Sequence, residues 1–166
     1  MSASPLAATS HREDNADAPN DTVSLAIAPW LREARPDTIA ELEEAYRLAV
    51  SLTDSRLLEL LALRIASLLG YPRTRAPWVS CASLPDAVIE RLPSWPEDPL
   101  FTERERDCLS FTEGFVMDVA GITDTDAAVV RRHFDDRSFL ALVTAIYLTE
   151  YTLRLQFVAE RLAGAQ

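Results

Sequence analysis

Few residues of this sequence could do nucleophilic, redox or metal chemistry. It holds two cysteines, Cys81 and Cys108, and two histidines, His11 and His133. The cysteines lie too far apart for a CxxC redox pair, and two are too few for a disulfide framework. Neither has a histidine close in sequence that could act as its base. All sixteen basic residues are arginine, which excludes Schiff-base chemistry by a lysine.

Each cysteine and histidine also has an ordinary structural interpretation. Cys108 falls on a predicted apolar helix stripe, where a cysteine usually packs as a small core residue. Cys81 lies near a predicted helix start, where a thiolate is favoured, so it is the better candidate for reactivity. His11 falls in a polar tail and His133 at a charged helix end, so both are predicted to be solvated. No phosphate loop, GxSxG motif or cluster of metal ligands occurs, and no cofactor is expected.

Four charged residues interrupt predicted apolar helices, and they are the remaining candidates for chemistry. Glu59 and Arg64 lie in one such helix, and Glu150 and Arg154 lie in another. Because an unpaired buried charge is costly, each is expected to have a partner. Glu150 and Arg154 are spaced i,i+4 and can pair along their own helix. These charges could tie core helices together, or Glu59 could act as an acid or base in apolar surroundings.

Composition limits the class of protein. The chain has 166 residues, of which 48% are apolar and 25% charged, as is typical of one globular domain. No uncharged apolar run reaches membrane-spanning length, and no signal peptide is expected, because the N-terminal residues do not include an apolar h-region. The net charge of −10 argues against nucleic acid or an anionic membrane as a partner. The cysteine content favours a cytoplasmic protein. The arginine, alanine and leucine bias favours a bacterial genome of high GC content.

The elements that position these residues are predicted to be helices. Residues 1–22 lack hydrophobic periodicity and are expected to be a disordered tail, which leaves a domain over 23–166. Residues 23–31 are apolar and are expected to pack on the core. Periodicity then predicts an all-α fold of about six helices. These span residues 36–50, 54–70, 84–92, 102–119, 123–134 and 136–162, with a loop at 93–99. Caps are expected at Thr38 with Glu41, at Thr102 with Glu105 and at Thr123 with Asp126, and Asp136 or Ser138 is expected to open the last helix. The helices at 36–50 and 54–70 are expected to pack as an antiparallel hairpin.

The helix at 54–70 is the most apolar of the set. Leucine, alanine and isoleucine cover nearly all its faces, as in a helix buried on all sides. Asp54 or Ser55 can cap its start, Gly70 can adopt the left-handed stop, and Pro72 cannot continue it. A dry helix that carries Glu59 and ends in a sharp turn is a suitable place for a site.

Three stretches of the chain share the pattern of a known family. They are ELLALRIASLLG at 59–70, LPSW at 92–95 with PLFTERER at 99–106, and HFDD at 133–136 with AIYL at 145–148 and Arg154. Over roughly residues 29–162, the sequence resembles the alkylhydroperoxidase-like branch of the carboxymuconolactone decarboxylase family. This resemblance implies an all-helical fold built on a helical hairpin. It also implies assembly as a homo-oligomer.

The resemblance also points to a departure at the active-site motif. Redox-active relatives carry a glutamate, then a Gly-Cys-x-x-Cys turn, then a histidine four residues on. Glu59 and Gly70 fall on the glutamate and glycine positions. Tyr71 and Thr74 stand in place of the cysteines, and Trp78 in place of the histidine. Because a phenol and a hydroxyl cannot form a disulfide, the usual peroxidase cycle is expected to be absent.

Three functional hypotheses follow. The first is a degenerate family member that binds a small molecule or acts as an interaction subunit. The second is a non-redox decarboxylase, isomerase or cyclase of a bacterial biosynthetic pathway, with Glu59 as acid/base, Tyr71 as phenolic donor and Arg73 as an anion clamp. The third is an atypical thiol peroxidase that uses Cys81, with Cys108 as the resolving thiol. Further ligand-binding candidates are Arg64, Arg75, Trp78, Glu150 and Arg154.

Overall fold

The described part of the chain is entirely helical. The computed structural model describes residue 27 and residues 29–71 and 84–163. Within these ranges no strand occurs, which confirms the predicted all-α class. The α-helices are α1 (Pro29–Ala34), α2 (Pro36–Ser51), α3 (Ser55–Leu68), α4 (Asp86–Arg91), α5 (Glu103–Met117), α6 (Asp124–Arg131) and α7 (Asp136–Ala163), with 3₁₀ turns η2 (Leu92–Ser94) and η3 (Val119–Gly121). None of the helices in the described ranges has the length and apolar character needed to cross a membrane. The predicted tail at 1–22 lies outside the described residues.

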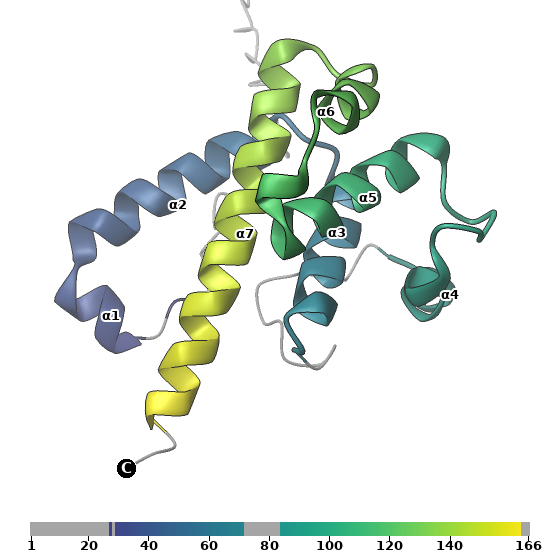
Figure 1. Cartoon of the computed structure of the whole chain (residues 1–166). Helices are drawn as coiled ribbons and strands as arrows, with labels where there is room; N and C mark the ends of the chain where they lie inside the picture. The colour runs from purple at the N-terminus through teal and green to yellow at the C-terminus, as the bar shows by residue number, and fades with distance from the viewer. Residues whose placement is uncertain (1–26, 28, 72–83, 164–166) are drawn as a thin grey trace, which may run out of the picture.

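The long helix α7 organises the packing (Figure 1). It runs through the molecule, with α2 packed on one side and α3 on another, while α5 packs on α3 and α6 packs on α5. The expected hairpin of 36–50 with 54–70 is therefore wrong, because α2 packs mainly on α7 and α3 packs on α5 and α7. The buried residues of α2 are only Ile39 and Ala49, whereas α3 buries seven apolar side chains. A helix that is apolar on most faces needs two partners, and α5 and α7 provide them.

The helix α3 begins and ends as its sequence predicts. The Asp54 side chain accepts a hydrogen bond from the Leu57 N–H at 2.9 Å and so caps the first turn. Gly70 has a φ of +76°, the left-handed stop. The Gly70 N–H donates to the Ser67 carbonyl at 3.1 Å, and the Tyr71 N–H donates to the Ala66 carbonyl at 2.8 Å. This hydrogen-bond pair is a Schellman motif, and it fixes the position of Tyr71.

Two ion pairs join α3 to α5. Arg56 Nε donates to Glu105 Oε1 at 2.7 Å, and Arg64 Nε donates to Glu113 Oε1 at 2.6 Å. Both pairs join residues 49 positions apart, so the two helices run in the same direction and stay in register over about two turns. The indole Nε1 of Trp95 donates to the same Glu113 oxygen at 2.6 Å. Glu113 therefore links α3, α5 and the segment after η2.

The capping boxes predicted at two helix starts are confirmed. Thr102 with Glu105 opens α5, and Thr123 with Asp126 opens α6, each with both reciprocal hydrogen bonds. The box expected at the start of α2 is not formed. Its helix begins directly at Pro36, whose fixed φ suits the first helical position, and its N-cap Arg35 makes no side-chain hydrogen bond.

Two boundaries differ from the prediction. The helix α5 ends at Met117, since Asp118 adopts an extended φ of −155° and η3 follows. Val119, the last residue of the predicted helix at 102–119, therefore lies outside α5 and is 62% exposed. At the start of α7, the Asp135 side chain accepts from the Ser138 N–H at 2.7 Å, so Asp135 is the cap in place of Asp136 or Ser138.

Candidate functional site

A cavity lies where the end of α3 meets the last turns of α7. Its volume is about 310 Å³, at the small end of the range typical of ligand sites. We call it the Tyr71 cavity. The described residues that line it are Leu69, Tyr71, Leu153, Arg154, Phe157 and Val158. The four α7 residues share one helix face by their i,i+4 spacing, and the Schellman turn brings Leu69 and Tyr71 opposite that face.

The phenol of Tyr71 is the unusual group in this cavity. The side chain is 6% exposed, and its ring packs edge-on against Phe157 with the ring centroids 5.7 Å apart. Its buried hydroxyl has no hydrogen-bond partner in the part of the chain that the structure describes. Burial, with a smaller contribution from the negative charge of Glu160, raises the pKa of Tyr71 to about 12. At neutral pH the phenol is therefore a protonated donor without an acceptor, and such a group costs about 1–3 kcal/mol of stability.

The only charged group in the described lining is Arg154, and its charge is already paired. Its Nε and Nη2 atoms lie 2.8 Å and 2.7 Å from Glu150 Oε1, which confirms the predicted i,i+4 pair. Nη2 also donates to the Val116 carbonyl at 3.4 Å. Arg154 and Glu150 further line a shallow groove of about 480 Å³ beside η3. The described lining of the Tyr71 cavity is therefore apolar apart from this paired arginine and the Tyr71 hydroxyl.

The other candidates from the sequence lie elsewhere or outside the described residues. Glu59 is half-buried on α3, and neither it nor Arg64 belongs to the described lining of the Tyr71 cavity. Arg64 is paired with Glu113, a partner that sequence reasoning missed. The common 49-residue separation of the two α3–α5 pairs becomes meaningful only once the helices are known to pack side by side. The positions of Arg73, Thr74, Arg75, Trp78 and Cys81 lie outside the described residues.

The thiol of Cys108 is a core group. The residue is fully buried, and its thiol forms no disulfide. Burial raises the pKa of the Cys108 thiol to about 12. Because the thiolate is the reactive form, a thiol in this setting is inert in the folded protein. The structure therefore agrees with the core-packing interpretation of Cys108.

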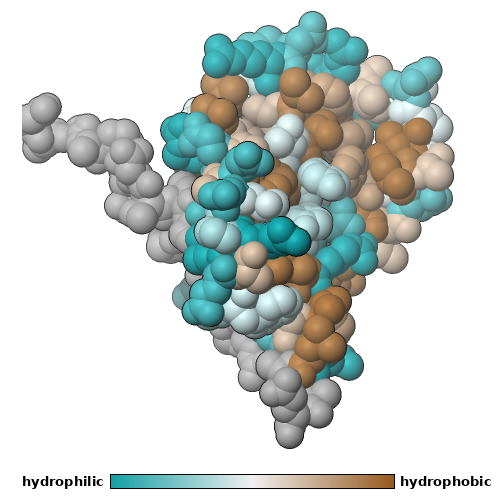
Figure 2. Space-filling model, turned by 90° about the vertical axis from the view of Figure 1, so that its left-hand side faces the viewer, coloured by the Kyte–Doolittle hydropathy of each residue, from teal (hydrophilic) through white to brown (hydrophobic). Residues whose placement is uncertain are grey.

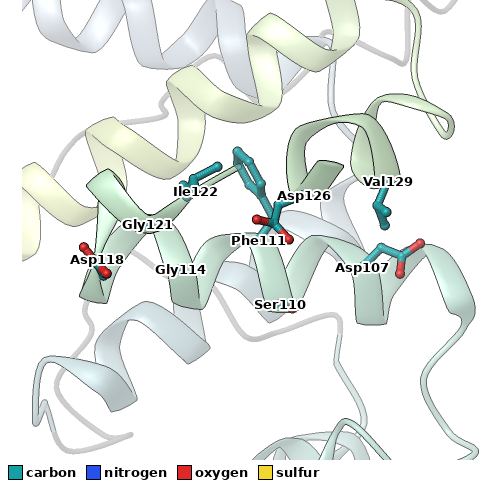
Figure 3. A pocket seen from close by; sticks show the side chains of 9 residues that line it. All are labelled: Asp107, Ser110, Phe111, Gly114, Asp118, Gly121, Ile122, Asp126 and Val129. Atoms are coloured by element: carbon teal, nitrogen blue, oxygen red, sulfur yellow. The ribbon is translucent and has the colours of Figure 1, made fainter. Parts of the chain in front are cut away.

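A second cavity, of about 330 Å³, lies between α5, η3 and α6, and we call it the acidic cavity (Figure 3). Asp107 and Asp118 mark its two ends along α5, and Phe111 lies between them with Asp126 of α6 nearby. The full lining is Asp107, Ser110, Phe111, Gly114, Asp118, Gly121, Ile122, Asp126 and Val129. Among the described residues no cluster of His, Cys, Asp and Glu is arranged to hold a metal ion.

Two of the three carboxylates of the acidic cavity already serve the fold. Asp107 Oδ2 accepts from Arg132 Nη2 at 2.7 Å and lies 2.7 Å from His133 Nε2. Burial opposes ionisation of Asp107, but the hydrogen bonds with His133 and Arg132 outweigh it and lower its pKa. Asp126 is the acceptor of the α6 capping box with Thr123. These partners account for both carboxylates without a ligand.

The pairing of His133 corrects a prediction. Its side chain is predicted from the sequence to be solvated, but in the structure it is only 17% exposed and contacts Asp107. The two residues lie 26 positions apart, and they meet because α6 packs on α5 and carries the chain back along it. Periodicity alone gives no sign of this return.

Large apolar side chains are also exposed on the outside of the molecule. Apolar patches interrupt the polar surface on the face seen in Figure 2. The described α7 residues of this kind are Leu140, Tyr147, Tyr151, Phe157, Val158 and Leu162, and Met117 and Val119 are exposed near η3. Contiguous exposed apolar surface is typical of interaction sites.

Comparison with known proteins identifies the fold. No protein-family profile and no curated protein matches this sequence. The crystal structure of a protein of unknown function from Agrobacterium tumefaciens, suggested to be the antioxidant defence protein AhpD, superposes with a TM-score of 0.62. The two sequences are 23% identical, and the match covers 75% of this chain and 89% of that chain. At this identity the likeness carries the architecture and not the activity, so the chain has an AhpD-like helical fold.

Proposed function

We propose that this protein is a non-redox member of the alkylhydroperoxidase-like branch and binds a small molecule in the Tyr71 cavity. The observation that carries the proposal is that Tyr71 lines a cavity of about 310 Å³ and that its buried hydroxyl has no hydrogen-bond partner among the described residues. Buried polar groups in proteins almost always have a partner, so a missing partner next to a cavity favours a bound ligand. The resemblance places Tyr71 where redox-active relatives carry their first thiol, and the Cys108 thiol is buried.

Absence of thiol redox activity is the first test. The purified protein, supplied with hydrogen peroxide and a dithiol reductant, should consume peroxide no faster than the buffer. Titration of the denatured protein should find the same number of free thiols before and after peroxide treatment. Sustained turnover, or the loss of two thiols, would support the thiol-peroxidase hypothesis of Cys81 and Cys108 instead.

Binding at the cavity is the second test, and it has a matched control. Val158 lies at the rim and is 53% exposed, so Val158→Trp should fill the cavity entrance without disturbing the core. Leu140 is 66% exposed on the same helix, about 27 Å away along its axis. Small apolar compounds that bind the wild type in ligand-observed NMR should lose binding in Val158→Trp and keep it in Leu140→Trp. Equal binding by both variants would place the site elsewhere.

We further propose that the protein forms a homo-oligomer through the exposed side chains of Tyr147 and Tyr151 on α7. The rings of Tyr147 and Tyr151 stack on each other with centroids 6.3 Å apart and remain 53% and 41% exposed. Aromatic residues are enriched at protein interfaces. Light scattering coupled to gel filtration should give a mass above that of one chain, and Tyr147→Glu should lower it. A monomeric wild type at all accessible concentrations would contradict this assembly.

A further inference from the structure

We propose that the Tyr71 cavity selects a neutral, largely apolar molecule that carries one hydrogen-bond acceptor, such as a ketone, ester or ether oxygen, to which the Tyr71 hydroxyl donates. This inference rests on the proposed function, because it names the ligand class of the same cavity.

The side chains that line the cavity favour a ligand whose main part is apolar. Leu69, Leu153, Phe157 and Val158 present only carbon side-chain atoms to the cavity. Transfer of apolar surface from water to such walls is favourable by about 25 cal/mol per Å². A strongly polar body would lose its hydration there without replacement hydrogen bonds. The ligand is therefore mainly hydrocarbon or aromatic.

The Tyr71 hydroxyl determines which functional group the ligand must carry. The Tyr71 hydroxyl is buried and bonded to no acceptor among the described residues, so we take it to be available as a donor. Its raised pKa keeps the proton on the oxygen throughout the physiological range. Only an acceptor can satisfy such a donor, and a site with a fixed donor discriminates strongly against an analogue that lacks the acceptor. The ligand therefore carries an oxygen or nitrogen acceptor near the end of its apolar body.

The charged groups near the cavity favour a neutral ligand over an anionic one. Arg154 is the only cation in the described lining, and it is held by Glu150 and by the Val116 carbonyl. The charge of Glu160 acts on the Tyr71 phenol in the direction that disfavours a second negative charge there. Arg161 stacks on the Phe157 ring and is not part of the described lining. Within that lining, an anionic ligand would therefore meet the field of Glu160 with no unpaired cation to offset it.

The experiment compares three small probes that differ only at the functional group. Acetophenone has an aromatic body with a ketone acceptor, ethylbenzene has a similar body without the acceptor, and benzoate has an anionic acceptor. Their dissociation constants are measured by NMR titration with the wild type, Tyr71→Phe and Tyr46→Phe. Tyr46→Phe is the matched control, because Tyr46 lies on α2 outside the described lining of the cavity and its hydroxyl is already hydrogen-bonded to Thr149 of α7.

The wild type should bind acetophenone about tenfold more tightly than ethylbenzene, in keeping with one buried hydrogen bond. Tyr71→Phe should lose this tenfold preference and bind ethylbenzene as the wild type does, while Tyr46→Phe should keep the preference. Because Tyr→Phe removes a single oxygen, both variants are expected to fold, which their circular dichroism would verify. Benzoate should bind more weakly than acetophenone to all three proteins.

The outcomes separate this inference from the proposed function. Equal affinity for acetophenone and ethylbenzene, unchanged in Tyr71→Phe, would overturn the acceptor inference and leave a purely apolar binding site. Tighter binding of benzoate than of acetophenone would overturn the neutral ligand class. No binding of any probe to the wild type at millimolar concentration would contradict small-molecule binding in this cavity, and the inference would fail with it.

Discussion

The acidic cavity and the Tyr71 cavity have similar volumes, about 330 Å³ and 310 Å³, but their polar groups differ. The acidic cavity carries three carboxylates, and two of them are engaged by the fold, Asp107 with Arg132 and His133 and Asp126 with its capping box. The described lining of the Tyr71 cavity has two polar side chains, those of Arg154 and Tyr71, and the Tyr71 hydroxyl has no partner among the described residues. The comparison shows that the number of polar groups in a cavity says less about ligand binding than whether the protein already satisfies them.

The largest loss of stability is expected when Glu113 is replaced, because it joins two helices and Trp95. Glu113 on α5 accepts from Arg64 on α3 and from Trp95, and these side chains are mostly buried. Glu113→Ala should lower the free energy of unfolding by about 2–3 kcal/mol, because two donors lose a charged acceptor. Urea denaturation measures the change. Glu103→Ala, on the same helix but at an exposed ion pair, is the control and should have little effect.

The next prediction tests whether Asp107 in the acidic cavity is paired with Arg132 and His133. Asp107→Asn should lower the free energy of unfolding at neutral pH by about 1–2 kcal/mol, since it removes charged hydrogen bonds to Arg132 and His133. The pKa of Asp107 is lowered in the folded protein, so its contribution is complete above the ordinary aspartate pKa and is lost as the pH falls below it. The difference between wild type and variant should therefore shrink in acid. A difference that grows as the pH falls would show that Asp107 is not held in this way.

Tyr46, whose hydroxyl has a hydrogen-bond partner, provides a reference for the stability effect of the Tyr71 hydroxyl. Tyr46 on α2 is hydrogen-bonded to Thr149 on α7, and Thr149 is 4% exposed. Tyr46→Phe should lower the free energy of unfolding by about 1 kcal/mol, because the bond is lost and the buried threonine keeps an unsatisfied hydroxyl. Thermal or urea denaturation at neutral pH measures it. An unchanged stability would mean that this hydroxyl is no better satisfied than that of Tyr71.

The last effect is absent at neutral pH and is confined to alkaline pH. The pKa of Tyr71 is raised to about 12, so the unfolded chain releases this proton first as the pH rises. The stability of the wild type relative to Tyr71→Phe should therefore be constant below pH 10 and fall between about pH 10 and 12. Denaturant titrations of both proteins over this range test the prediction. A constant difference up to pH 12 would indicate an ordinary, solvated phenol.

Much of the fold could be predicted because its signals are local. The Asp54 cap, the Gly70 stop and the Thr102 and Thr123 capping boxes depend on residues within one or two helical turns. The wrong pairing of α2 with α3 has the opposite origin. Which neighbour a helix chooses depends on how many of its faces must be covered, and that choice is made by the whole molecule.

The site was predictable only in part, for the same physical reason. The Glu150–Arg154 pair was predicted and confirmed, because i,i+4 spacing on a helix brings two side chains together. The partners of Arg64 and His133 were missed, since they come from helices that are distant in sequence. Tyr71 was selected by its place after Gly70, but the missing acceptor of its hydroxyl is a property of the packed structure.

The most direct test of the unpartnered phenol is the stability of Tyr71→Phe without ligand. The account predicts that its free energy of unfolding at neutral pH exceeds that of the wild type by about 1 kcal/mol, because a buried donor without an acceptor is removed. Tyr46→Phe, measured in parallel, should change in the opposite direction. A loss of stability in Tyr71→Phe as large as that in Tyr46→Phe would show that the hydroxyl has a partner within the protein, and the ligand-binding account would be contradicted.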